Sequence, residues 1–105
     1  MKSDNDASLK NAKMASGEAP ASRKCIYEAI DAERDRQWEQ WSESHKWGAG
    51  DCSSPNVAPM VKVAVLTEEC GEVARAVLER DTDALRRELV QVAAVAVAWL
   101  EGLKA

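Results

Sequence analysis

The stretch that decides the fold spans residues 59–103 and reads PMVKVAVLTEECGEVARAVLERDTDALRRELVQVAAVAVAWLEGL. Its first part predicts a helix over residues 59–80, because Pro59 suits the first turn of a helix. The Asp-Thr-Asp sequence at 81–83 predicts a tight break, with Thr82 or Asp83 capping the next helix. Since the link between the two helices is short, they are expected to form an antiparallel hairpin.

The second helix of this hairpin is expected to continue to about residue 103. The β-branched residues between Val90 and Val97 would also suit a strand, but the length, the cap and the alanine content favour a helix. Apolar residues recur here at steps of four and three, which is a helical period: Leu85, Leu89, Val92, Ala96, Trp99 and Leu103.

The preceding residues predict one more helix, from about Arg23 to Lys46, with Ser22 as its N-terminal cap. Its apolar residues are sparse, so its buried face is expected to be narrow and to include Trp38. Gly48 is predicted to cap its C-terminus, and residues 48–59 are predicted to form a loop. Residues 1–22 are polar, and we expect them to form a flexible tail ahead of a helical domain over residues 23–105.

These elements together predict an all-α protein, a bundle of three main helices. The chain has 105 residues, and small domains bury a smaller share of their surface than large ones. We therefore expect the bundle to be completed by oligomerisation.

Charge and hydropathy exclude several classes of protein. Acidic residues exceed basic ones by 18 to 14, so a partner held by phosphate neutralisation, such as a nucleic acid, is not expected. The longest apolar run, Val92 to Leu100, is too short to span a bilayer, so no membrane partner is expected. The N-terminal residues lack the apolar segment of a secretory signal. The three cysteines are widely spaced and predict free thiols, so we expect a cytoplasmic protein.

Two polar pairs fall in corresponding places on the two helices of the hairpin. Glu69 and Glu72 lie three residues apart, as do Glu88 and Gln91, and residues three apart on a helix are surface neighbours. On a helical wheel Glu69 and Glu88 fall at the margins of their apolar arcs, so the two pairs are predicted to face one another. The apolar arc on the first of these helices is expected to contain Leu66, Cys70, Val73 and Val77.

Such a cluster of carboxylates is relieved by a hard divalent cation, and Mg²⁺ prefers oxygen ligands. The alternative interpretation is that acidic residues flank the apolar stripe of any amphipathic helix and hold nothing.

The pattern Glu-Glu-x-x-Glu at 68–72, fifteen residues, then Glu-x-x-Gln at 88–91 resembles the signature of the all-α nucleotide pyrophosphohydrolases of the MazG type. That signature is Glu-x-x-Glu, a spacer of similar size, then Glu-x-x-Asp on the next helix. The segments 33–37 (Glu-Arg-Asp-Arg-Gln) and 46–48 (Lys-Trp-Gly) are similar to the first helix of MazG-like proteins. The resemblance covers residues 26–103.

This resemblance implies a Mg²⁺-dependent enzyme, with Mn²⁺ as a possible substitute, that hydrolyses nucleoside triphosphates between the α and β phosphates. It implies Glu69, Glu72 and Glu88 as metal ligands, with Gln91 in the place of the family's Asp. Glu68 would be a further ligand or the base that activates water. The resemblance also implies a homodimer or homotetramer with the site near a subunit interface.

Gln91 leaves two readings open, because its neutral side chain offers one carbonyl oxygen where Asp offers a charged carboxylate. It either still serves the metal, or the chain is a weakened or inactive relative that acts as a nucleotide-binding or interaction module.

Four further residues are candidates for binding substrate. Lys62 lies two turns before Glu69 on the same helical face, where it is expected to be either a phosphate contact or a solvated lysine. Arg34 and Lys46 are candidates for the triphosphate, although charged helix faces are usually just solvated. Trp47 is a candidate for stacking on the nucleobase.

Overall fold

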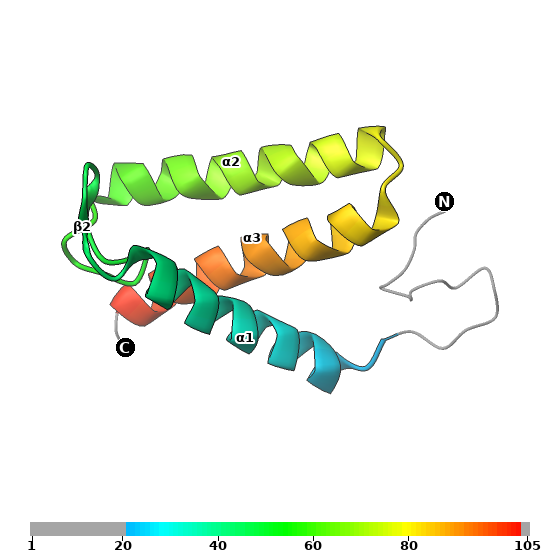
Figure 1. The fold of residues 1–105 in the computed structure, drawn as a ribbon, viewed down its shortest axis with the longest axis horizontal. Helices are drawn as coiled ribbons and strands as arrows, with labels where there is room; N and C mark the ends of the chain where they lie inside the picture. Colours follow the sequence, from blue (N-terminus) through cyan, green and yellow to red (C-terminus); the bar gives the residue numbers. More distant parts are fainter. Residues whose placement is uncertain (1–20, 104–105) are drawn as a thin grey trace.

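The structure, a computed structural model, describes residues 21–103. It contains α1 (Arg23–Trp41), the short strands β2 (Ser44–His45) and β3 (Gly48–Ala49), α2 (Pro59–Leu78) and α3 (Thr82–Leu103). The helices α2 and α3 form an antiparallel hairpin, and α1 lies against the other side of α3 (Figure 1). The predicted all-α fold with three main helices is confirmed. Most of the predicted tail, residues 1–20, lies outside the described residues.

The turn between α2 and α3 has a different cap from the one that the sequence predicted. The carboxylate of Asp81 accepts a hydrogen bond from the backbone N–H of Ala84 at 2.9 Å, so neither Thr82 nor Asp83 caps α3. Arg80, with φ of 56°, takes the left-handed conformation that reverses the chain. Asp81 is then positioned to cap a free amide group in the first turn of the helix, and the prediction was wrong by one residue.

The end of α1 also differs from the prediction. Ser22 caps the helix as expected, accepting a hydrogen bond from the N–H of Cys25 at 3.1 Å. The helix ends at Trp41 rather than at Lys46, and the next residues form the antiparallel pair β2–β3. Gly48 is therefore not a helix cap: it has φ of 137°, and a Cβ there would lie 2.1 Å from the carbonyl oxygen of Asn56. Only glycine permits this approach of the loop.

The core is small and contains unusually many polar groups. Its buried apolar residues are Val57, Ala76, Ala94, Val95 and Ala98. The buried polar and charged residues are almost as many: Arg34, Gln37, Asp51 and Lys62. Trp38 is 55% exposed, so the expectation that it belongs to the buried face of α1 is wrong. That face buries the polar pair Arg34 and Gln37 in its place.

The inward face of α2 is rotated from the predicted one. Lys62 and Ala76, seven residues to either side of Glu69, are both buried, and residues seven apart share a helical face. Glu69 therefore lies on the inward face rather than at its margin. Cys70 and Val77, which were expected in the apolar arc, are exposed.

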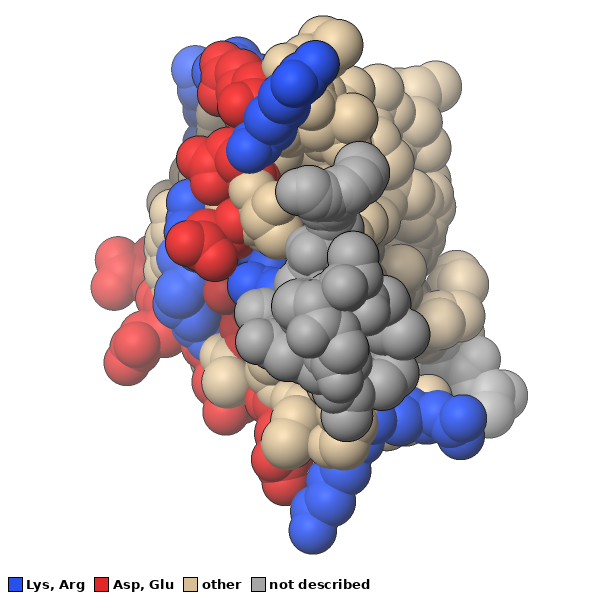
Figure 2. Space-filling model, turned by 90° about the vertical axis from the view of Figure 1, so that its right-hand side faces the viewer, with Lys and Arg blue, Asp and Glu red and all other residues tan. Residues whose placement is uncertain are grey.

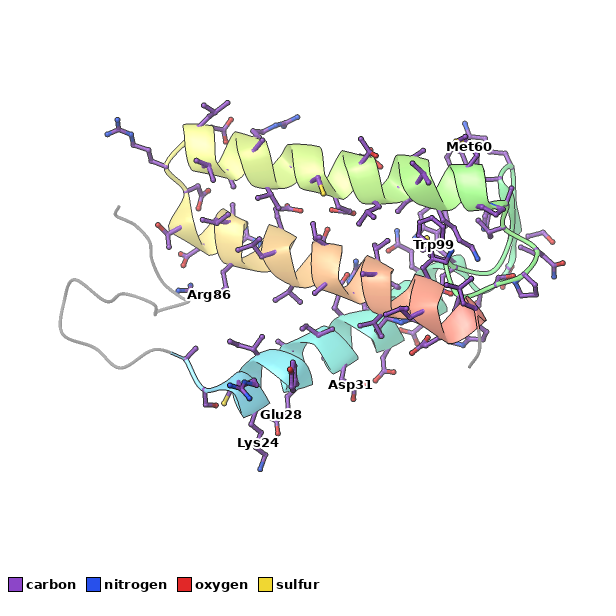
Figure 3. The ribbon with its side chains drawn as sticks, turned by 180° about the vertical axis from the view of Figure 1, so that it is seen from behind. Lys24, Glu28, Asp31, Met60, Arg86 and Trp99 are labelled. Atoms are coloured by element: carbon purple, nitrogen blue, oxygen red, sulfur yellow. The ribbon has the colours of Figure 1, made fainter. Side chains whose placement is uncertain are left out.

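Large apolar side chains remain exposed along the hairpin. They include Met60, which points away from α3 (Figure 3), together with Val63, Val77, Leu78, Leu89, Leu100 and Leu103. A view onto the α2–α3 turn shows charged side chains gathered on one side and an uncharged surface on the upper part of the other side (Figure 2). Between residues 21 and 103, no helix has the length and apolarity needed to cross a bilayer.

Candidate functional site

Three of the predicted site residues meet between α2 and α3. In the amide orientation that satisfies its surroundings, the Gln91 nitrogen lies 2.8 Å from Oε1 and 3.3 Å from Oε2 of Glu69. The same nitrogen lies 3.3 Å from Oε1 of Glu88. The hairpin therefore brings Glu69, Glu88 and Gln91 together as the sequence pattern predicted. We call these three residues and Glu72 the acidic cluster.

The carboxyl group of Glu69 is strongly perturbed by this arrangement. Its pKa is raised from 4.5 to about 7, first by burial, then by the charge of Glu88 and a hydrogen bond with that carboxyl group. The charges of Glu68 and Glu72 raise the pKa further. Burial and neighbouring like charges both disfavour the ionised form. The cluster thus holds more negative charge than its surroundings compensate, which is a common property of functional sites.

Glu72 lies at the edge of this cluster. Its Oε2 is 3.6 Å from the guanidinium of Arg75 on the next turn, and its side chain is 37% exposed. Glu68 is exposed on the neighbouring face of α2. In the part of the chain that the structure describes, no group of three or more His, Cys, Asp or Glu side chains is arranged to hold a metal ion. The cluster has the predicted residues, but Glu72 is turned toward Arg75.

The first helix contributes a positive charge near the cluster. Arg36 donates from Nε and NH2 to the two oxygens of Glu33 at 2.9 and 2.5 Å. The pKa of Arg36 is raised, chiefly by this hydrogen bond with Glu33 and also by the charges of Glu33 and Glu69. The positive charge of Arg36 therefore interacts with the carboxyl group of Glu69 while its guanidinium is bonded to Glu33. The segment that carries the family resemblance contains both residues, and their spacing of three on a helix is one at which such pairs form.

Lys62 occupies the inward face of α2, two turns from Glu69. Only 6% of the residue is exposed, but its Nζ atom is not among the fully buried atoms without a partner, so the aliphatic part is packed while the ammonium group reaches solvent. The phosphate contact and the solvated lysine both stay predictions. Among residues 21–103 it has neither a hydrogen-bond nor an ion-pair partner. Burial raises the pKa of the Cys52 thiol, and the positive charge of Lys62 partly opposes this. An ammonium group that is held on a packed stem and has no partner among the described residues is available to an anion, which makes Lys62 a candidate for meeting one.

Arg34 belongs to a second cluster at the other end of the bundle. Its guanidinium donates to Asp51 at 2.7 Å, to Glu101 at 2.6 Å and to Gln37 at 3.3 Å. We call these four residues the balanced cluster. Burial alone would raise the pKa of Asp51, but hydrogen bonds from Ser53 and Arg34 and the charge of Arg34 together lower it. The predicted substrate contact of Arg34 stays a prediction, and the contacts that it makes here join α1, the loop and α3.

Sequence reasoning did not find Asp51 or Glu101. Neither lies in a recognisable spacing to Arg34, since they are 17 and 67 residues away. The only local signal is Gly50, directly before Asp51, with φ of 92°. A Cβ at Gly50 would meet the Ser54 side chain at 2.7 Å, so this position requires the tight loop that presents Asp51 to Arg34.

Aromatic rings gather where the β2–β3 hairpin meets the end of α1. The centroids of Trp41 and His45 lie 5.3 Å apart, and each lies 6.2 Å from that of Trp47. The Nζ atom of Lys46 lies 4.7 Å from the centre of the Trp47 ring. Trp47 is 49% exposed, and Lys46 lies over one face of its ring, so a base would stack on the other face.

A comparison with protein families finds a match to part of this chain. The family model of the MazG nucleotide pyrophosphohydrolase domain matches residues 59–101, which are α2, the turn and nearly all of α3. Comparisons with curated proteins and with solved structures find no match. The match covers fewer than half of the residues of the chain, and over residues 59–101 it confirms the resemblance predicted from the sequence. It contains both halves of the acidic cluster, whereas α1 and the loop lie outside it.

Proposed function

We propose that the protein is a Mg²⁺-dependent nucleoside triphosphate pyrophosphohydrolase. One water would add across the α–β anhydride bond of an NTP or dNTP, giving a nucleoside monophosphate and pyrophosphate. The observation that carries this proposal is the convergence of Glu69, Glu88 and Gln91 across the hairpin that the family model matches.

The donor set of the acidic cluster fits a hard divalent cation. It consists of carboxylate oxygens and one amide, which Mg²⁺ prefers and Mn²⁺ accepts. The raised pKa of Glu69 supports the same conclusion, because excess negative charge is what a cation relieves. Glu69, Glu72, Glu88 and Gln91 would hold the cation, with Glu72 released from Arg75. When bound, such a cation supplies charge neutralisation for the phosphates and makes a coordinated water more acidic.

The protein's own side chains would position the other reactants. Glu68, beside the cluster and exposed, would accept a proton from the attacking water. The ammonium group of Lys62 has no hydrogen-bond or ion-pair partner among the described residues, and it would bind a phosphate oxygen. Trp47 would stack on the base, with Lys46 beside it. Arg34 would support the site by stabilising the fold, because its guanidinium is already bonded to two carboxylates.

A second candidate function is nucleotide binding without turnover. Gln91 in place of an aspartate favours it, because the site then has one negative charge fewer and binds a cation more weakly. The orientation of Glu72 toward Arg75 favours it too. In this case nucleotide with Mg²⁺ would raise the melting temperature while no product forms.

We also propose that the chain acts as a homodimer or homotetramer. Large apolar residues of α2 and α3, Met60 and Leu78 among them, are exposed, and contiguous exposed apolar surface is typical of interfaces between subunits. Analytical ultracentrifugation distinguishes the states. A monomer at micromolar concentration would contradict this part of the proposal.

The test of the activity is a screen of NTPs and dNTPs with Mg²⁺ or Mn²⁺, with pyrophosphate measured and products identified. Glu88→Gln removes one charge of the cluster without changing its size, and we expect it to lower the rate about a hundredfold or more. Glu28→Gln is the matched control, because Glu28 points away from the bundle on α1 (Figure 3). No pyrophosphate from any nucleotide with either metal would contradict the enzymatic proposal.

A further inference from the structure

We propose that Gln91 is an internal substitute for a cation: its amide N–H groups hold the Glu69 and Glu88 carboxylates together when no metal is bound. The effect that Gln91 would have on metal affinity rests on the function proposed above. The clamp itself concerns the metal-free protein and stands without that function.

The geometry gives each carboxylate a donor. The amide nitrogen of Gln91 has two hydrogens, and it lies 2.8 Å from Oε1 of Glu69 and 3.3 Å from Oε1 of Glu88. One N–H can therefore point at each carboxylate, and hydrogen bonds to ionised acceptors are stronger than those between neutral groups. An aspartate or glutamate here would present only acceptors when ionised. Glutamine thus joins two groups that a carboxylate would push apart.

No other described side chain bonds to both carboxyl groups, which bond directly to each other only when one of them is protonated. No Lys, Arg or His within residues 21–103 forms an ion pair with Glu69 or Glu88. Arg36 is bonded to Glu33 and Arg75 is near Glu72. Gln91 is consequently the only described side chain that donates hydrogen bonds to both carboxylates.

The same side chain also carries an acceptor. A primary amide has its oxygen opposite its nitrogen, and half a turn of the amide plane exchanges them. Gln91 can thus face the carboxylates with its nitrogen in the metal-free protein and offer its oxygen to a cation. Glutamine therefore has two opposite effects. It holds the metal-free site together, but it gives a bound cation one negative charge fewer than an acidic residue at the same position would give. This accounts for glutamine at a position where the family signature has aspartate.

The experiment compares melting temperatures at pH 8 in EDTA for the wild-type chain, Gln91→Glu and Gln91→Met. Met matches the length of Gln and removes the donors without adding charge, whereas Glu removes the donors and adds a carboxylate. We expect Gln91→Glu to melt about 5–15 °C below wild type, with Gln91→Met between them. Gln40→Glu makes the same change on the exposed side of α1 beside Arg36, and we expect it to melt like wild type.

The proposal is overturned if both Gln91 variants melt within about 2 °C of wild type in EDTA, a shift too small for the loss of these bonds. If Gln91→Glu does not fold in EDTA while Gln91→Met is folded but less stable, the clamp is upheld.

Adding Mn²⁺ then separates the clamp from the proposed function. We expect Mn²⁺ to restore the melting temperature of Gln91→Glu and to bind it at least tenfold more tightly than wild type. A loss of stability in EDTA that Mn²⁺ does not restore upholds the clamp and contradicts the proposed metal site.

Discussion

The two polar clusters of this small bundle differ in how their charges are compensated. In the balanced cluster, Arg34 is bonded to Asp51 and Glu101 at 2.7 and 2.6 Å, and the pKa of Asp51 is lowered. In the acidic cluster, carboxylates face one another and the pKa of Glu69 is raised to about 7. Opposite shifts in two carboxyl groups of one chain show that burial alone does not decide the outcome. The partner does: the carboxylate of Asp51 is paired with a cation, whereas that of Glu69 faces other carboxyl groups.

The largest expected effect comes from breaking the balanced cluster. Arg34→Met leaves the buried carboxylate of Asp51 without its cation, so we expect a loss of about 3–5 kcal/mol in the free energy of unfolding. Urea denaturation followed by circular dichroism measures it. Arg36→Met is the matched control on the same helix, because Arg36 makes an exposed ion pair with Glu33 worth about 1 kcal/mol or less. Equal losses in the two variants would contradict the claim that the ion pairs of Arg34 stabilise the fold more than the ion pair of Arg36 does.

A smaller effect is expected from two glycines at different places in the bundle. A Cβ at Gly102 would lie 2.5 Å from the carbonyl oxygen of Ser53, so Gly102→Ala should push the loop away from α3 and cost about 1–3 kcal/mol. A Cβ at Gly71, in the middle of α2, meets nothing within 4 Å. Gly71→Ala should therefore stabilise the chain by about 0.5–1 kcal/mol. Melting curves test both, and a stabilised Gly102→Ala would show that the loop does not dock on α3.

The two clusters should respond oppositely to pH in metal-free buffer. Because the folded pKa of Glu69 lies near 7 and its ordinary value is 4.5, the folded chain binds the extra proton between these values, and stability falls as pH rises through that window. Asp51 has a lowered pKa, so its contribution is present above pH 3.8 and is lost as pH falls through its folded pKa.

Melting curves from pH 3 to 8 check this. Glu69→Gln should flatten the loss between about 4.5 and 7, whereas Glu28→Gln should keep it. Identical curves for all three proteins would show that Glu69 ionises normally.

The smallest effect on stability is expected at Lys62. Met keeps the packed aliphatic stem of Lys62 and removes an ammonium group that has no described partner, so Lys62→Met should change the free energy of unfolding by no more than about 1 kcal/mol. If Lys62 holds phosphate, the same variant should bind nucleotide at least about tenfold more weakly in the presence of Mg²⁺. A variant that is clearly destabilised and binds nucleotide normally would assign Lys62 to the fold.

How much the sequence reveals depends on the range of the interactions. The bounds of α2 and α3 and the meeting of Glu69, Glu88 and Gln91 could be predicted, because they follow from helical period and one short turn. The rotation of α2 could not, because Cys70 and Val77 look like core residues when only their own helix is considered. Arg34 bonds to Glu101, which lies 67 residues away in the sequence, and no local sequence pattern predicts a contact of this range.

The end of α1 is an intermediate case. Residues 42–47 continue a helical composition, but Gly48 and Gly50 adopt positive φ angles and the side chain of His45 bonds to the carbonyl of Gly50 at 2.8 Å. The hairpin is held by these contacts and by the bridge from Gly48 to Val57, which tertiary structure supplies.

The most direct test of the central claim is a Mn²⁺ titration of the full chain at pH 8, followed by electron paramagnetic resonance. The account predicts saturable binding to wild type and to Glu28→Gln, and binding at least about tenfold weaker in Glu88→Gln, because one charge of the acidic cluster is lost. Equal binding by wild type and Glu88→Gln would contradict the claim that the uncompensated charge between α2 and α3 is a cation site.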